Sequence, residues 1–435
     1  MTKTTNASDT ADAVIIGAGL GGLATAARLA NAGLRVIVCE RASEAGGRGR
    51  SVTRDGFTLN LGAHALYADG PAIAMLRSLD LAPRGRSPAS GGLLIRDGKA
   101  HAIPTSPLSM LSSTALELRS KFDLLRFFAR LGRMSSAGLE HVSCQDWLAE
   151  QFSRADLRAF GAALVRLATY CGEPESLSAD AVLTQLQGAS RGALYLDDGW
   201  AQLVDGLVER CVAAGVELRF GAKVGAVGRA DTARWAVEVD GHALTCDHLI
   251  VAGSPQLADR LLADLLNGPR FGAGTRPLTT ACLDLGLRGE WPGPSFAINL
   301  DEPIYPSVPS RTAALAPAGH TLVSLVWYRR DCDAETPAAE LRARLERYAR
   351  RWMPDYESAL VVEQYLPDMT VAHDRPRPST GGLPGRPSVC VADGLYLVGD
   401  WVGEHGQLLD ASLASAAAVS DAVLTQRKGA RKLAG

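Results

Sequence analysis

The chain has 435 residues, which is more than a single hydrophobic core usually supports, so we expect two interwoven domains. Its formal net charge of −2 lacks the basic surplus that is typical of nucleic-acid-binding proteins, so nucleic acid is not an expected partner. The eight cysteines show neither CxxC pairs nor Cys/His metal spacing, which indicates free thiols in a reducing, cytoplasmic compartment and no metal site.

We expect no membrane anchor in this sequence. Residues 1–12 are polar, and no window approaches the roughly 18 apolar residues of a spanning helix. Residues 116–133 mix leucine and phenylalanine with arginine and lysine, as in helices that contact a membrane surface. An ordinary helix of a substrate domain is the favoured interpretation of this stretch, and peripheral membrane contact is the alternative.

The N-terminal region has the pattern of a βαβ unit. Residues 13–16 form a short apolar run that predicts a buried parallel strand. Residues 20–32 are rich in alanine and leucine at helical spacing, and residues 34–39 form the next apolar run. A strand, a helix and a second strand within so short a segment predict the start of a Rossmann-type domain.

The turn between the first strand and the helix is glycine-rich, with the order Gly17-Ala18-Gly19-Leu20-Gly21-Gly22. In this motif the first glycine permits a tight turn, the second lets the backbone approach a pyrophosphate, and the third lets helix and strand pack closely. The N-terminus of the helix then offers free N–H groups to the phosphates. Glu40 ends the second strand, where an acidic residue accepts ribose hydroxyls, and a glutamate there favours FAD or NAD over NADP.

The rest of the chain alternates between helical and β patterns. Residues 108–149 and 155–169 are helical patterns broken by glycine and proline, and a β-like pattern begins at Lys223. We then expect a second sheet, with strands at residues 279–287 and 321–328, and an amphipathic helix over 334–353. A loop rich in proline and glycine over 374–387 is expected to lead to a last buried strand at 395–398 and a last helix at 411–423.

Further motifs separate FAD from NAD. Glu40 is followed by Gly46-Gly47-Arg48, and the later motifs are Gly62-Ala63-His64, Lys223-Val224, Gly399-Asp400-Trp401-Val402-Gly403 and Asp410-Ala411-Ser412. In this order they resemble the flavin-dependent amine oxidase and phytoene desaturase superfamily, over essentially the whole chain. The resemblance implies one FAD, bound non-covalently.

The resemblance also implies a role for each motif. Arg48 would reach the FAD phosphates, and Val224 would hold the adenine through backbone atoms. Asp400 would bind the ribityl or pyrophosphate region, and residues 409–411 would present backbone N–H groups to the flavin pyrimidine. The implied cofactor-binding residues are Gly17, Ala18, Gly19, Gly21, Gly22, Glu40, Arg41, Gly47, Arg48, Gly62, Ala63, His64, Val224, Gly399, Asp400, Leu409, Asp410 and Ala411.

Two departures from the amine oxidases favour the desaturase branch of this superfamily. Amine oxidases typically hold a water at flavin N5 with a lysine, but this chain has no lysine between Lys223 and Lys428. Leu408 and Leu409 stand where a tyrosine often precedes the flavin-contacting segment. Both features indicate a phytoene desaturase-like or protoporphyrinogen oxidase-like enzyme, which removes hydrogen from C–C or C–N bonds of apolar substrates.

His64 and His405 are the candidate catalytic residues, because both lie beside flavin-contacting motifs and a histidine can move a proton near neutral pH. A hydrogen-bonded structural role is the alternative for each. Trp327 and Tyr328 fall on the strand that lines the substrate cavity in relatives, and only one of two strand neighbours can face it. We expect this cavity to be lined mainly by aliphatic and aromatic side chains, with few charges.

Together these features predict an α/β fold. A discontinuous Rossmann-type FAD domain is expected over residues 1–65, 191–255 and 385–435, with an inserted α+β substrate domain over 66–190 and 256–384. The expected activity is FAD-dependent dehydrogenation, by desaturation or aromatisation, of a small apolar metabolite through hydride transfer to flavin N5. The alternatives are an amine oxidase, a non-redox flavin-dependent isomerase and a non-catalytic binding protein on the same fold.

Overall fold

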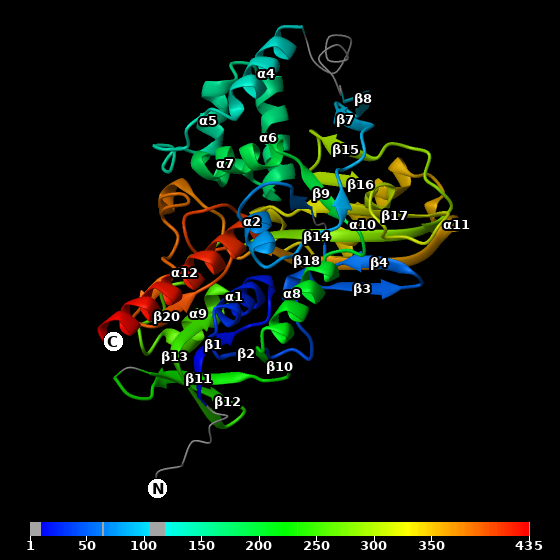
Figure 1. Cartoon of the computed structure of the whole chain (residues 1–435). Coiled ribbons are helices and arrows are strands. Elements are labelled where there is room, and N and C mark those ends of the chain that lie inside the picture. The colour runs from blue at the N-terminus through cyan, green and yellow to red at the C-terminus, as the bar shows by residue number, and fades with distance from the viewer. Residues whose placement is uncertain (1–9, 63–64, 104–117, 233, 435) are drawn as a thin grey trace.

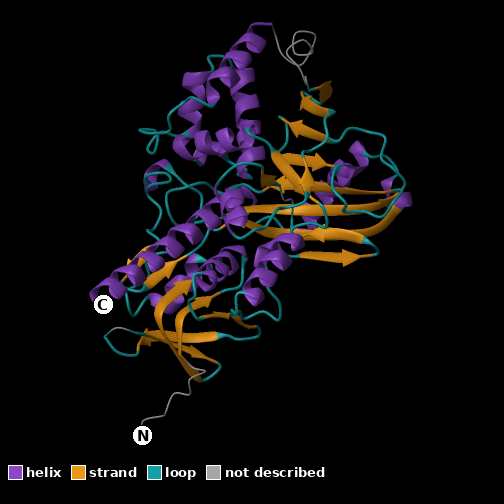
Figure 2. Ribbon diagram, viewed as in Figure 1, coloured by secondary structure: helices purple, strands orange, loops and turns teal. Residues whose placement is uncertain are grey.

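The polypeptide forms two large β-sheets with helices packed over each of them (Figure 1). The structure is a computed structural model and describes residues 10–62, 65–103, 118–232 and 234–434. In Figure 2 the larger helical group lies at the top of the view, beside the second sheet, and the first sheet lies at the bottom.

The first sheet has the predicted βαβ unit at its centre. β1 (Thr10–Ile16) runs parallel to β2 (Val36–Cys39) and to β13 (His242–Val251). The sheet is completed by β10 (Glu217–Arg219) and β20 (Leu395–Leu397), which are also parallel, and by the antiparallel strands β11 (Val224–Arg229), β12 (Trp235–Val239) and β19 (Cys390–Ala392). Apolar runs such as residues 13–16 are buried because helices or strands cover both faces of the sheet.

The two faces of this sheet are covered by different elements. Ala13 and Ile15 pack against α1 (Leu20–Asn31), α2 (Pro71–Ser78), α8 (Ala201–Ala213) and α12 (Leu408–Ala434). Val14 and Ile16 point to the other face, where they pack with β11, β12 and α9 (Pro255–Leu262). This alternation along β1 follows from the period of two in a strand.

Helix α12 corrects one expectation from the sequence. Its residues Leu408–Lys428 are long and apolar enough to span a membrane by length and composition, although no such window was expected. In the structure Ala416, Val419 and Val423 are completely buried in the core that α12 shares with α1 and α2. The small alanine and serine side chains of α12 allow this close packing, so the core accounts for the apolar residues on the buried face of the helix.

The second sheet has the strand order β18-β14-β17-β16-β15-β7-β8. Its long strands are β14 (Leu278–Arg288), β17 (His320–Tyr328) and β18 (Leu360–Ala372), and its short ones are β7 (Gly92–Arg96), β8 (Lys99–Ala102), β15 (Phe296–Asn299) and β16 (Ile304–Ser307). One face packs on α10 (Ala338–Trp352). The helix predicted over 334–353 begins only at Ala338, because Pro337 is its N-cap and residues 331–333 form a separate 3-10 turn.

A helical group and two small sheets complete the fold. α4 (Leu118–Leu131), α5 (Cys144–Gln151), α6 (Ala155–Thr169) and α7 (Ala179–Ser190) share one apolar core. The small sheets are β3 (Ser51–Arg54) with β4 (Phe57–Asn60), and β5 (Leu66–Tyr67) and β6 (Gly85–Arg86) on either side of β9 (Ala193–Leu196). The predicted helical pattern over 108–149 is thus divided between α4 and α5, and residues 104–117 lie outside the described part of the chain.

The α/β fold class is confirmed. The strands of the first sheet come from residues 1–65, 191–255 and 385–435, and those of the second from 66–190 and 256–384. β7 pairs in parallel with β15, which joins the two inserted segments in one sheet. The domain boundaries themselves stay a prediction.

Candidate active site

A cavity of about 900 Å³ opens at the carboxyl ends of the parallel strands of the first sheet. Ile16 and Cys39 line it at the ends of β1 and β2, and Ala252 and Val398 line it just beyond β13 and β20. In open α/β sheets ligands bind at this edge. Thr280 and Met369 of the second sheet line the cavity as well, so both sheets contribute to it.

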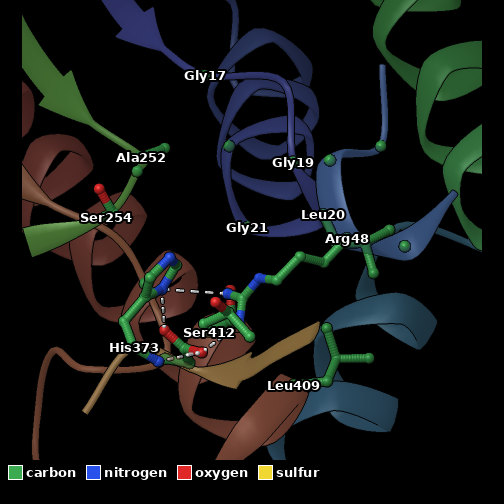
Figure 3. Close-up of a pocket in the computed structure, with 18 of the residues that line it drawn as sticks. Gly17, Gly19, Leu20, Gly21, Arg48, Ala252, Ser254, His373, Leu409 and Ser412 are labelled. Carbon is green, nitrogen blue, oxygen red and sulfur yellow. Dashed lines mark hydrogen bonds and ion pairs between the residues drawn. The ribbon is translucent and has the colours of Figure 1, made fainter. Parts of the chain in front are cut away.

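The glycine turn of residues 17–22 forms one wall, shown in Figure 3. Gly17 has a φ of +110°, and a Cβ there would lie 2.3 Å from the carbonyl oxygen of Ala252. A Cβ on Gly22 would lie 2.1 Å from the carbonyl oxygen of Gly17. A Cβ on Gly19, in contrast, would meet no atom within 4 Å. Gly17 and Gly22 are therefore required for packing, whereas Gly19 keeps space free inside the cavity.

Glu40 lies at the end of β2 and lines the same wall. Its two carboxylate oxygens accept hydrogen bonds from the backbone amides of Ala18 and Ala42, each at 2.8 Å. These bonds fix the side chain beneath the glycine turn. Each oxygen keeps a further lone pair that can accept a ligand hydroxyl.

Arg48, Asp400 and His373 form a hydrogen-bonded cluster that also lines the cavity. Nη1 of Arg48 donates to Oδ2 of Asp400 at 2.8 Å and to the carbonyl oxygen of Val371 at 2.8 Å. Nδ1 of His373 lies 2.8 Å from Oδ1 of Asp400, and Figure 3 shows Arg48 pointing toward His373. Burial by itself would raise the pKa of Asp400, but Arg48 and His373 hold this pKa well below its ordinary value. Asp400 is therefore a buried, ionised carboxylate.

The start of α12 forms a further wall. Leu408 has a φ of +56°, a left-handed conformation that a leucine rarely adopts and that marks local backbone strain. Leu409 and Asp410 follow it and line the cavity. Oδ1 of Asp410 accepts a hydrogen bond from the amide of Ala72 at 2.8 Å, in the first turn of α2. Burial raises the pKa of Asp410.

We call the part of the cavity next to the second sheet the inner end, lined by Leu61, Gly62, Leu66, Tyr67, Tyr170, Thr280 and Met369. Tyr67 is held in place there by two hydrogen bonds. Its hydroxyl donates to the carbonyl oxygen of Ala168 at 2.8 Å and accepts from Nε2 of Gln185 at 3.1 Å. Tyr170 caps the C-terminus of α6 with a φ of 62°, so this aromatic side chain also sits on a strained backbone.

Comparison with known families decides the assignment of this cavity. A family model described as flavin containing amine oxidoreductase matches residues 20–424, which is almost the whole chain. The chain belongs to this family.

Individual relatives are more distant. The chain is 31% identical over 143 residues to protoporphyrinogen oxidase 2, chloroplastic/mitochondrial, of Arabidopsis thaliana, a match over 32% of this chain and 28% of that protein. It is 50% identical over 56 residues to a neurosporene-forming phytoene desaturase of Cereibacter sphaeroides, over 13% of this chain and 11% of that one. A solved structure of a redesigned putrescine oxidase has 19% identity and a TM-score of 0.75, over 96% of this chain and 99% of the other. The curated matches are thus partial, and the structural match establishes the fold.

As a flavin-containing amine oxidoreductase, the protein is an oxidoreductase and binds FAD non-covalently. Its residues fit this cofactor. The free space at Gly19 and the N–H groups at the start of α1 suit a pyrophosphate, and Glu40 suits a ribose. Val224, at the start of β11, lines the cavity where it would contact the adenine, and the N-terminus of α12 suits the flavin pyrimidine.

Most of the predicted cofactor-binding residues line the cavity. These are Gly17, Gly19, Gly21, Gly22, Glu40, Arg41, Gly47, Arg48, Gly62, Val224, Gly399, Asp400, Leu409 and Asp410. Ala18 and Ala411 are buried and do not line it, although the amide of Ala18 holds Glu40. Ala63 and His64 lie outside the described residues, so His64 stays a prediction.

The structure does not bring His405, the other catalytic candidate, to the cavity. His405 is exposed and does not line the cavity, because the loop around it turns outward between Gly403 and Gly406, which both have positive φ angles. Among the described residues, His373 is the histidine that lines the cavity, and sequence reasoning missed it. It follows β18 without any local motif, and only the tertiary pairing with Asp400 reveals its place.

The expectation of few charges concerned the substrate part of the cavity and stays a prediction there, whereas the cavity as a whole is charged. Its charged lining residues are Glu40, Arg41, Arg48, Lys223, Arg260, Asp400 and Asp410. A dinucleotide is an anion with many polar groups, and its site needs such side chains. The inner end differs, because its lining residues are aliphatic, aromatic or hydroxyl-bearing.

Proposed function

We propose that this oxidoreductase dehydrogenates a small, largely apolar metabolite at the inner end of the cavity, by desaturation or aromatisation. The observation that carries the proposal is the chemistry of the inner-end wall. Leu61, Leu66, Thr280 and Met369 carry no charge, and the hydroxyl of Tyr67 is bonded to protein groups. Among the described lining residues of this end and of the adjoining start of α12, the carboxylate is that of Asp410, which already accepts a hydrogen bond from the amide of Ala72. An ammonium group that left water there would have to share it to replace its hydration.

The distribution of lysine supports the same proposal. Lys223 is the sole lysine among the described residues that line the cavity, and it stands beside Val224 at the nucleotide end. At the start of α12 the wall combines the apolar side chains of Leu408 and Leu409 with Asp410, whose Oδ1 already accepts a hydrogen bond from the amide of Ala72. A water-binding lysine of the kind found in amine oxidases is not part of the described lining.

The bound FAD supplies a two-electron acceptor at flavin N5, and the protein supplies position and desolvation. Leu66 and Met369 exclude water from the inner end, which strengthens the remaining polar contacts. Tyr67, locked by Ala168 and Gln185, and Tyr170, locked by its position at the end of α6, give the wall a fixed shape. A substrate held against a rigid wall approaches the reactive geometry with little loss of entropy.

The test uses the purified FAD-loaded protein under anaerobic conditions. Dihydronaphthalene, benzylamine and putrescine are added separately, and bleaching of the visible flavin absorption is followed while products are identified by mass spectrometry. We expect dihydronaphthalene to bleach the flavin and to give naphthalene, with one hydride and one proton lost per molecule. Rapid bleaching by the amines, with no reaction of dihydronaphthalene, would replace the proposal by an amine oxidase.

A second outcome separates the isomerase alternative. The same compounds are incubated with protein whose flavin has first been reduced by dithionite. A product with the same mass as its substrate, formed only by the reduced protein and without any flavin bleaching in the oxidised one, would identify a non-redox isomerase.

A further inference from the structure

Tyr170 lines the inner end of the cavity on an unusual backbone. It is the C-cap of α6, with a φ of 62° and a ψ of 14°, and its amide donates to the carbonyl oxygen of Arg166 at 2.8 Å. Glycine or asparagine adopts this left-handed conformation with little strain, whereas an aromatic residue rarely does. Strained residues of this kind cluster at ligand sites, so the side chain of Tyr170 is a candidate for direct contact with a ligand.

The second sheet supports the ring of Tyr170. Thr280 of β14 stands opposite Met369 of β18 and opposite Tyr328 of β17, and directly opposite residues in an antiparallel pair point to the same face. Because Thr280 and Met369 line the cavity, Tyr328 lies on the cavity side of the sheet, and its neighbour in sequence, Trp327, packs on the other side against α10. The rings of Tyr328 and Tyr170 meet edge to face, with centroids 6.0 Å apart and an interplanar angle of 71°. Tyr328 itself does not line the cavity, so of these two rings that of Tyr170 meets a ligand.

The hydroxyl groups of the inner end differ in their partners. Tyr67, Tyr170 and Thr280 are the hydroxyl-bearing residues among those that define this end. The hydroxyl of Tyr67 makes two hydrogen bonds to protein groups, and Oγ1 of Thr280 lies 3.4 Å from Sγ of Cys282, within hydrogen-bonding distance of a sulfur atom. The hydroxyl of Tyr170 forms no hydrogen bond with a described residue.

The hydroxyl of Tyr170 is open to the cavity. In the described part of the chain, the unpaired polar side-chain atoms that are completely buried include the hydroxyl of Tyr328 but not that of Tyr170. Since Tyr170 lines the cavity, its accessible and unpaired hydroxyl faces the space that a ligand fills. Burial raises the pKa of Tyr170 well above its ordinary value, so the hydroxyl stays protonated and can donate a hydrogen bond.

The chemistry of this hydroxyl selects the partner. The partner of an O–H donor must carry a lone pair, which a carbonyl oxygen has and an ammonium group lacks. Leu61, Leu66 and Met369 make the surrounding wall apolar, so the rest of the ligand is expected to be apolar. A ligand with one acceptor oxygen and a hydrocarbon body therefore fits this end of the cavity.

We propose that the hydroxyl of Tyr170 binds an oxygen atom, such as a carbonyl oxygen, on the otherwise apolar substrate and thereby sets the orientation in which the substrate meets the flavin. This inference rests on the proposed function, because it places the substrate at the inner end. Tyr170 is thus a specificity-determining residue, and the fixed Tyr67 beside it shapes the wall without binding the oxygen.

The test compares three ligands of one shape on the FAD-loaded protein, namely acetophenone, ethylbenzene and α-methylbenzylamine. Binding is measured by perturbation of the visible flavin absorption and by titration calorimetry. We expect acetophenone to bind about tenfold more tightly than ethylbenzene, since one satisfied hydrogen bond away from bulk water is worth about that factor. The variant Tyr170→Phe should remove this preference and leave the affinity for ethylbenzene unchanged.

The matched control is Tyr305→Phe. Tyr305 belongs to the same aromatic cluster as Tyr170, but its hydroxyl lies 3.4 Å from that of Tyr195 and it does not line the cavity. This variant should keep the preference for acetophenone. Equal binding of ketone and hydrocarbon by the parent, a ketone preference that survives in Tyr170→Phe, tightest binding of the amine, or no binding of any of the three would overturn the proposal.

Thermal unfolding separates binding from folding. Because the hydroxyl of Tyr170 has no protein partner, Tyr170→Phe should keep the melting temperature of the parent, whereas Tyr67→Phe loses a twice-bonded hydroxyl and should melt at a lower temperature. A lowered melting temperature in Tyr170→Phe would mean that its hydroxyl is bonded within the protein, and would overturn the proposal as well. Since binding is measured without turnover, a protein that prefers acetophenone but is reduced by no dihydroaromatic compound would contradict the proposed function alone.

Discussion

Nη1 of Arg48 donates a hydrogen bond of 2.8 Å to Oδ2 of Asp400, a residue 352 positions further along the chain. The contact connects the first and the last segments that build the FAD site. It leaves Arg48 about one-third exposed while Asp400 is buried. The guanidinium thus neutralises a buried carboxylate and still presents N–H groups to the cavity.

We predict that Arg48→Met lowers the affinity for FAD by about 10- to 100-fold, because it removes a charge-assisted donor from the phosphate side of the site. The dissociation constant can be measured by titrating apoprotein with FAD and following flavin fluorescence. Arg84→Met is the matched control, since Arg84 forms an exposed ion pair with Asp198. Unchanged FAD affinity in Arg48→Met would show that the pair is purely structural.

The glycine turn gives a paired prediction. A Cβ on Gly19 meets no atom within 4 Å, so Gly19→Ala should fold with a normal melting temperature but lose FAD, because the methyl group projects into the cavity. Gly22→Ala places its Cβ 2.1 Å from a backbone oxygen and should destabilise the apoprotein itself. Calorimetry of both apoproteins and their flavin content check this. The prediction is wrong if Gly19→Ala retains FAD, or if the apoprotein of Gly22→Ala has the same melting temperature as the parent apoprotein.

Asp284 predicts a dependence of stability on pH. Burial raises its pKa to about 6, although Ser324 and Gln364 lower it through hydrogen bonds. An unfolded aspartate titrates near about pH 4, so between about pH 4 and 6 the folded state binds more protons, and stability falls as pH rises through this window. Asp284→Asn has no such titration. Its stability relative to the parent should rise from near zero at about pH 4 to on the order of 2–3 kcal/mol above about pH 7.

Chemical denaturation of both proteins at several pH values measures this difference. Asp205→Asn, an exposed position on α8, is the control and should give a curve parallel to that of the parent. A constant difference between Asp284→Asn and the parent would mean that the carboxyl of Asp284 does not titrate in this range.

The unpaired hydroxyl of Tyr328 gives a prediction for the stability of the ligand-free protein. Because its buried hydroxyl is unpaired, Tyr328→Phe is expected to stabilise the ligand-free protein by about 1–3 kcal/mol. A tyrosine whose hydroxyl is hydrogen-bonded in the folded protein would lose stability on the same change. Urea denaturation of the ligand-free protein distinguishes the two results, and it needs no knowledge of the substrate.

The sequence predicted those parts of the site that depend on local geometry. The glycine turn and Glu40 could be placed because a strand, a tight turn and a helix N-terminus impose fixed residue types at fixed spacing. His373 could not be placed, because its position depends on where β18 ends relative to β20. Tyr328 was expected to differ from Trp327 in direction, but the period of a strand alone does not say which of the two faces the cavity.

Errors in the elements have similar causes. The last helix was expected to start at Ala411, whereas α12 begins at Leu408, a leucine in the left-handed backbone conformation that its residue type does not predict. The membrane-length apolar stretch in α12 was overlooked because alanine and serine dilute its hydropathy without interrupting it. Neither feature follows from local propensity.

The order of strands in the first sheet also affects how the protein is made. β1 is the earliest of the described strands along the chain and a central one, yet its neighbour β13 pairs Thr245 with Thr10, 235 residues later. At about 5–20 residues per second, translation needs on the order of tens of seconds to supply that neighbour. The apolar face of α1 is covered later still, because it packs on α12, which is synthesised after β13. The nascent N-terminal unit therefore stays open to chaperones, and its folding is coupled to completion of the distant C-terminal segment.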